Sequence, residues 1–166
     1  MKLLLRISGL LLGLLLPAGA LHAQTLWPGT TAGMSLEEVR KLYPGAHDAE
    51  KARELPAGRG VELLDLAETE IAGRQFRVEF FFKEERLVHV SLFAIGEINE
   101  KEFERFRDLL RAKYNQEYST TSSETIQIRW NAVQTVILLT WIPLGRENSS
   151  MEISYEAPIP KETDRL

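Results

Sequence analysis

Two histidines, His47 and His89, are the residues after position 23 that are best suited to general acid–base chemistry, and the whole chain contains no cysteine. Catalysis of the Ser–His–acid type would need one of these histidines beside an activated serine. No serine lies in a strand–turn–helix elbow of the G-x-S-x-G kind. His89 falls in the middle of a predicted strand, where a structural role is the more common one. We therefore expect no catalytic residues and a protein that is not an enzyme.

Metal and phosphate chemistry find equally little support in the residue spacings. His47, Asp48 and Glu50 lie close together, but their spacing matches no tetrahedral metal site. The segment 58–60 lacks the lysine, the further glycines and the strand-to-helix context of a phosphate-binding loop. Carboxylates are plentiful, as in any acidic chain, and no pair of them can be assigned to one cleft. We expect neither a metal nor a cofactor.

The first 23 residues have the pattern of a secretory signal peptide. Lys2 and Arg6 form a short basic start, an apolar run comes next, and small residues lead up to Ala23. The run is too short and wrongly flanked for a stable membrane span. Cleavage after Ala23 is favoured, and cleavage after Ala20 is the alternative. We expect a periplasmic protein without a lipid anchor, because no cysteine is present to carry one.

The charge balance disfavours two further classes of partner. The 20 basic residues fall to 18 without Lys2 and Arg6, and the 24 acidic residues then give a formal charge of −6. Binding to nucleic acid needs a concentrated basic face, and attraction to anionic lipid surfaces also needs basic residues. No later apolar stretch is long enough to cross a membrane. A protein partner or a second copy of the chain is the expected partner.

Two stretches predict helices with complete start signals. Ser35 can cap a helix that ends before Pro44, and Glu38 completes a capping box. A second helix, expected from about residue 100 to residue 114, repeats this pattern 64 residues later with Asn99 and Glu102. The first helix has one apolar stripe, which consists of Leu36, Val39, Leu42 and Tyr43.

The segments after each helix have the character of β-strands. The clearest two-residue period lies in segment 74–83, where Phe76, Val78 and Phe80 point one way while Arg77 and Glu79 point the other. Between the first helix and the first strand we expect a polar loop over residues 45–60. The predicted strands cover residues 61–71, 74–83, 87–93, 125–130, 134–143 and 151–155.

This element order predicts an α+β fold. It consists of a two-layer arrangement, with an antiparallel sheet of about six strands and two helices on one face, as a tandem α-β-β-β repeat. One domain over residues 24–157 would contain two similar halves, 33–93 and 98–156. The tail 158–166 is expected to be loose.

The segment from Val136 to Ile142 is apolar on both faces, whereas a strand covered on one side only would alternate. Either the sheet curls until its second face is partly covered by the chain itself, or that face meets a partner or a ligand. We expect Phe81 and Phe93 to belong to the same second-face patch. The predicted partner-binding surface consists of Arg77, Phe81, Phe93 and Leu138.

The segment 33–39, GMSLEEV, resembles the Gly-Met-Thr/Ser-x-x-x-Val signature that opens SmpA/OmlA-type outer-membrane assembly lipoproteins. Similar openings occur in secreted β-lactamase-inhibitor-like proteins, whose fold is a tandem of small helix-plus-sheet units. The chain departs from the lipoproteins because it lacks the lipidation cysteine. The resemblance implies a periplasmic, non-catalytic interaction module.

These observations favour a soluble periplasmic binding or envelope-assembly accessory protein that acts through an exposed sheet face. An inhibitor of a secreted hydrolase is the first alternative, with the loop over residues 45–60 as its contact surface. A small-ligand carrier and an enzyme that uses His47 or His89 are further alternatives.

Overall fold

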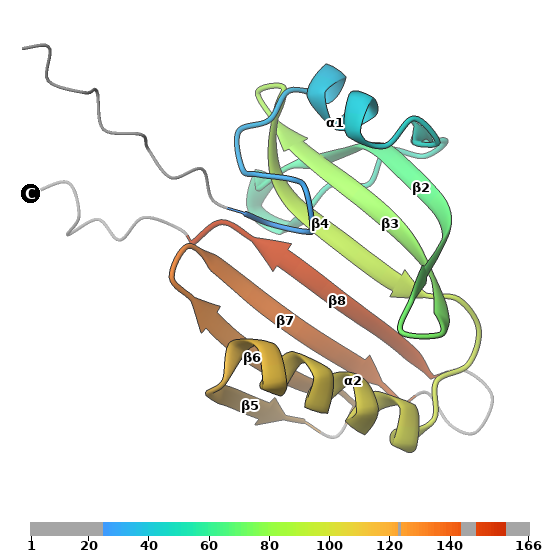
Figure 1. Ribbon diagram of the computed structural model, residues 1–166, viewed down its shortest axis with the longest axis vertical. Coiled ribbons are helices and arrows are strands. Elements are labelled where there is room, and N and C mark those ends of the chain that lie inside the picture. Colours follow the sequence, from blue (N-terminus) through green and yellow to red (C-terminus); the bar gives the residue numbers. More distant parts are fainter. Residues whose placement is uncertain (1–24, 123, 144–148, 159–166) are drawn as a thin grey trace, which may run out of the picture.

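The computed structural model describes residues 25–122, 124–143 and 149–158, so the predicted signal peptide and nearly all of the predicted tail lie outside these ranges. Within them the chain forms two α-helices, a short 3-10 turn at Pro56–Gly58 and one antiparallel sheet of eight strands (Figure 1). The helices are α1 (Leu36–Leu42) and α2 (Glu100–Tyr114). The strands are β1 (His47–Asp48), β2 (Val61–Ile71), β3 (Arg74–Lys83), β4 (Arg86–Ala94), β5 (Glu117–Thr121), β6 (Ile126–Ala132), β7 (Thr135–Ile142) and β8 (Ser150–Glu156).

The α+β class is confirmed, but the predicted number of about six strands is wrong. The two additional strands, β1 and β5, are the edges of the sheet, and each comes directly after a helix. β1 has only two residues, both exposed, and lies in the segment that we expected to be a loop. β5 is polar and almost entirely exposed. Neither has a buried side to impose a two-residue period, which is why the sequence pattern missed them.

The strand order is β1-β2-β3-β4-β8-β7-β6-β5, so the two sets of four strands lie side by side in one sheet and run through it in opposite orders. Each set begins at an outer edge with the strand that comes after its helix and ends at the centre of the sheet. β4 and β8, the last strand of each set, pair with each other, and Val90 lies opposite Tyr155 there. Every strand pair in the sheet is antiparallel.

Both predicted capping boxes are present. In α1, the Ser35 side chain accepts a hydrogen bond from the Glu38 N–H (3.3 Å), and the Ser35 N–H donates to the Glu38 carboxylate (2.7 Å). In α2, Asn99 and Glu102 repeat the arrangement at 3.0 and 3.4 Å. A cap of this kind stabilises a helix by about 1 kcal/mol, which matters most for α1 because it is only seven residues long.

Both helices lie on the same face of the sheet, as their aromatic contacts demonstrate. The Phe106 ring of α2 meets Phe76 edge-on, with 5.4 Å between centroids, and the Tyr43 ring at the end of α1 lies 5.4 Å from Phe80. Phe76 and Phe80 are four residues apart on β3 and therefore point to one side. We call this side the helix face and the opposite side the second face.

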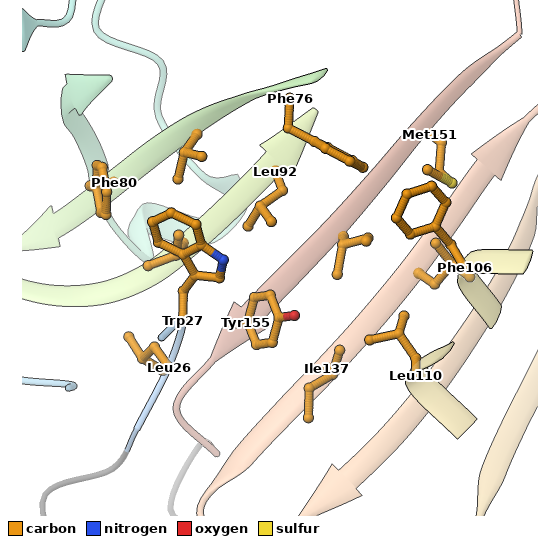
Figure 2. Close-up of a cluster of buried hydrophobic side chains, with 14 of the residues drawn as sticks. Leu26, Trp27, Phe76, Phe80, Leu92, Phe106, Leu110, Ile137, Met151 and Tyr155 are labelled. Carbon is orange, nitrogen blue, oxygen red and sulfur yellow. The ribbon is translucent and has the colours of Figure 1, made fainter. Parts of the chain in front are cut away.

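The lead-in before α1 fills the space between the two helices. Leu26 and Trp27 are buried, and Trp27 stacks on Tyr43 with 5.1 Å between ring centroids. Figure 2 shows Trp27 between Phe80 of β3 and Tyr155 of β8, so this segment contacts both halves of the sheet. A tight turn holds it in place, because the Thr30 hydroxyl accepts from the Trp27 N–H and donates to the Trp27 carbonyl. The core is therefore continuous from one half to the other.

An ion-pair cluster ties the end of α2 to the edge strand β5. Arg107 and Arg111 both donate to the carboxylate of Glu117, at 2.5 and 2.9 Å. The hydrogen bonds from Arg111 and then from Arg107 lower the pKa of Glu117 to about 2. α2 also contacts β6, so the helix lies over the outer strands of its half.

We expect Glu117→Gln to lower the free energy of unfolding at pH 7 by about 1 kcal/mol, a value reduced for the partial exposure of the arginines. Folding depresses the pKa of Glu117, so its ion pairs stabilise the folded state fully above the ordinary carboxyl pKa of 4.5. This stabilisation is lost as the pH falls toward about 2. Urea denaturation at pH 7 and at pH 2.5 measures the difference in the free energy of unfolding between the variant and the wild type at each pH. Glu70→Gln, at an exposed position of β2, is the control. An equal loss at both pH values would contradict this account.

Candidate functional site

The second face is the candidate site, because the four predicted partner-binding residues all lie on it. Arg77 of β3 and Phe93 of β4 are direct cross-strand neighbours, with the Arg77 Cζ 5.7 Å from the centre of the Phe93 ring. Leu138 of β7 is half-buried on the same face. Phe81 also points to this side but is completely buried. It therefore contributes to the support beneath the surface and not to the surface itself.

A buried carboxylate organises the half of this face formed by β2, β3 and β4. Glu79 is 1% exposed, and each of its oxygens accepts a hydrogen bond from an arginine. Arg77 donates to Oε1 at 2.5 Å, and Arg53 donates to Oε2. The two arginine side chains remain 54% and 50% exposed. A buried charge is tolerated only when it is paired and hydrogen-bonded in this way.

Arg53 belongs to the strap, by which we mean residues 49–60 between β1 and β2. The Arg53 guanidinium lies over Phe93 and Phe81, with its Cζ 4.7 and 5.4 Å from the ring centres. The chain passes very close to the sheet at the end of the strap, since a Cβ on Gly60 would lie 2.9 Å from a methyl group of Val88. The strap therefore covers Phe81 and brings a second arginine to Glu79.

Sequence reasoning did not identify Arg53 or the burial of Glu79. Arg53 lies in a segment without periodicity, 26 residues before its partner. Glu79 alternates with apolar residues, so the pattern assigned it to the opposite face from Phe76 and Phe80 but did not indicate that it is buried. The only signal available was Phe81, an aromatic residue on the polar side of a strand, which indicates that this side is partly covered.

Glu62 lies beside Glu79 and its two arginines, but its own ion pair is longer than theirs. Its carboxylate is 3.7 Å from the Nε of Arg53. Burial, and then the negative charge of Glu79, raise the pKa of Glu62, while Arg53 and Arg77 act in the opposite direction. These groups line an open cleft of about 660 Å³, which contains carboxylates and basic groups from the strap, β2 and β3.

A second polar cluster lies where β4 meets β8. The Ser91 hydroxyl donates to Glu152 (2.6 Å), so its oxygen accepts the Nε2–H of His89 (2.7 Å). The other ring nitrogen of His89, Nδ1, is 3.7 Å from Glu156, which also accepts a hydrogen bond from Arg59 of the strap at 2.8 Å. The His89 ring, and less strongly Arg59, lower the pKa of Glu156 against the effect of burial.

The order Ser91, His89, Glu156 has the residue types of a hydrolytic triad, but its geometry does not suit that chemistry. Ser91 is completely buried in the sheet, so a substrate carbonyl has no access to its oxygen. Its proton is directed to Glu152 and not to His89. This arrangement satisfies buried polar groups, and it links the strap to β8 through Arg59 and Glu156.

The other chemistry-bearing residues do not form a site. His47 and Asp48 are exposed on β1, and Asp48 pairs with Arg40 of α1. Among the described residues, no group of three or more histidine, cysteine or acidic side chains is placed to hold a metal ion. No helix within the described ranges is long and apolar enough to cross a membrane.

No protein-family model, curated protein or solved structure matches the chain significantly. The resemblance of segment 33–39 to the assembly lipoproteins therefore stays a prediction. The chemistry of the second face is therefore the feature of the molecule that indicates its function.

Glu62→Gln is expected to stabilise the protein at neutral pH. A carboxyl group whose folded-state pKa is raised favours folding fully only below its ordinary pKa of 4.5, and this contribution is lost as the pH rises through the raised value. The variant carries no charge to desolvate, so its advantage over the wild type should appear between pH 4 and pH 7. Chemical denaturation at several pH values across this range measures the difference in the free energy of unfolding between the variant and the wild type. An advantage that is independent of pH, or a loss at pH 7, would contradict the assignment.

Proposed function

We propose that this chain is a non-catalytic protein-binding module of the periplasm that acts through the second face of its sheet. One observation carries the proposal. Two half-exposed guanidinium groups, those of Arg53 and Arg77, are held over the Phe93 ring by the buried carboxylate of Glu79.

Such an arrangement is suited to binding because the arginines are already ordered. Fixing a long side chain at an interface costs about 0.5–1.5 kcal/mol, and here the ion pairs to Glu79 and the stacking on Phe93 have met part of that cost. An arginine has five N–H donors, so donors remain for carboxylates or carbonyls of a partner. Arginine and aromatic side chains are also those that most often dominate binding energy.

The surface extends from the arginines toward the other half of the sheet. Beyond Phe93 the same row continues through Glu152 of β8 and Thr140 of β7 to Gln127 of β6. Half-buried Leu138 lies in the next row, between Ser154 and Arg129. A mixed apolar and polar surface of this kind is typical of a non-obligate protein interface.

The absence of a catalytic role is part of the proposal. It is supported by the burial of Ser91, by the direction of its proton and by the exposed, separated position of His47 on β1. The periplasmic location is inferred from the signal-peptide pattern of residues 1–23.

We further interpret the fold as a tandem repeat. Matching capping boxes 64 residues apart, each leading into four strands that are placed symmetrically in the sheet, support two copies of one α-β-β-β-β unit. This is the kind of architecture that the resemblance to β-lactamase-inhibitor-like proteins implies.

Site-specific photo-crosslinking in cell-envelope extracts tests the proposal. A photoreactive amino acid at Arg77, Phe93 or Leu138 should capture the same partner, whereas one at Lys101, exposed on α2, should capture none. Arg129→Glu, at an exposed position directly opposite Leu138, should then weaken capture from position 138 at least tenfold, because it reverses a charge at the proposed contact. Lys101→Glu is the matched charge control. The proposal fails if the three second-face positions capture nothing, or only what Lys101 also captures.

Inhibition of a secreted hydrolase remains a second candidate, and one observation favours it. The strap is anchored on both sides of its 3-10 turn, by Arg53 on Glu79 and by Arg59 on Glu156. A pre-organised loop is what a tight inhibitor requires. Titration against a panel of proteases, lactamases and lysozymes should then give stoichiometric inhibition that Arg59→Ala weakens. Lack of inhibition across the panel would exclude the tested classes.

A further inference from the structure

The edge strand β5 has no partner strand on its outer side within the part of the chain that the structure describes. The opposite edge, β1, has only two residues and continues into the irregular strap. β5 has five residues, EYSTT, and four of them are uncharged in a chain that is 27% charged. It contains neither lysine nor proline, the residues that usually prevent an edge strand from pairing with another chain.

The hydrogen-bond register shows which backbone groups of β5 are free to pair outward. The Ser122 N–H donates to the Thr125 carbonyl at the hairpin that joins β5 to β6 (2.9 Å). Because hydrogen-bonded pairs alternate along an antiparallel ladder, Tyr118 and Thr120 bond to β6. The N–H and C=O groups of Ser119 and of both terminal residues of β5 therefore point away from the sheet.

We propose that β5 is a self-association site, at which a second copy of the chain adds its own β5 in antiparallel orientation about a two-fold axis at Ser119. This inference does not depend on the proposed function, because it depends on the outward backbone groups of the sheet edge and not on the arginines or Phe93.

The occupant is a second copy because the strand is complementary to itself. Two-fold pairing sets Tyr118 opposite Thr120 of the other copy, an aromatic–β-branched pair, and both lie on the second face with Arg129 and Gln127. Glu117 lies opposite the uncharged Thr121 of the other copy, so no like charges of the two β5 strands lie opposite each other. Tyr118 is 53% exposed and has apolar surface to bury in this pair.

The helices leave room for this arrangement. α2 contacts β6, the second strand from the edge. Because ion pairs to Glu117 also hold α2 to β5, the helices of the joined sheet are separated by two to three strand spacings, about 10–14 Å. Packed helices need only about 8–10 Å between their axes. A five-residue pairing buries a small area, so the association should be reversible and should depend on concentration.

Sedimentation equilibrium of the folded protein from about 1 µM to about 1 mM, the range expected of small interfaces, measures this association. We expect a monomer–dimer equilibrium that Ser119→Pro weakens at least tenfold, because proline removes an outward N–H without breaking a bond to β6. Ser119→Ala keeps the N–H and should dimerise like the wild type. A protein that stays monomeric throughout, or a dimer that Ser119→Pro leaves unchanged, would overturn the proposal.

A cysteine trap gives a second readout if the proline variant does not fold. Ser119→Cys would be the only cysteine of the chain. Paired at Ser119, the two Cα atoms would be about 5.5 Å apart, within the range of a disulfide. Mild oxidation should give a covalent dimer, while Gln127→Cys, one strand further in, should remain monomeric. Equal crosslinking of Ser119→Cys and Gln127→Cys would show that the copies meet at another interface, which overturns the proposal. A Ser119→Cys variant that stays monomeric and pairs only with an added extended peptide would also overturn it, because β5 would then bind a partner other than a second copy.

Discussion

The pairing of β4 with β8 is the interaction on which the rest of the structure depends. Each half alone would be a four-stranded sheet with one helix, and α1, at seven residues, is far too short to be stable in isolation. Joining the halves through β4 and β8 places Val90 opposite Tyr155 and Leu92 opposite Ile153 on the helix face. The lead-in with Leu26 and Trp27 then covers the seam, so that one core serves both halves.

The same pairing determines the character of the second face. Both helices cover the opposite side, so within the described ranges the second face of the central strands is covered by side chains and by the strap, without a helix. The strap buries Glu79, and a buried carboxylate costs several kcal/mol unless it is well paired. Arg53 and Arg77 supply that pairing and stay half-exposed. The groups that stabilise the buried charge are therefore also the groups most available to a partner.

Prediction from the sequence succeeded where structure is determined by near neighbours. Both capping boxes and the boundaries of β3 were predicted correctly, because a cap involves residues three apart and the apolar residues of β3 that face the helices recur with a two-residue period. It failed for β1 and β5, whose side chains are mostly exposed and carry no period. It also left the burial of Glu79 undetermined, since alternation distinguishes two faces but does not say whether the strap covers one of them.

The sequence by itself determined the class of the fold, the order of its central elements and the lack of cysteine chemistry. These properties depend on composition and on spacings of two to four residues. The tertiary structure alone decided that β4 pairs with β8, that Arg53 reaches a carboxylate 26 residues away and that β5 forms an unprotected edge. The physical reason is that strand order and ion pairing depend on contacts between residues far apart in the chain, which local patterns do not encode.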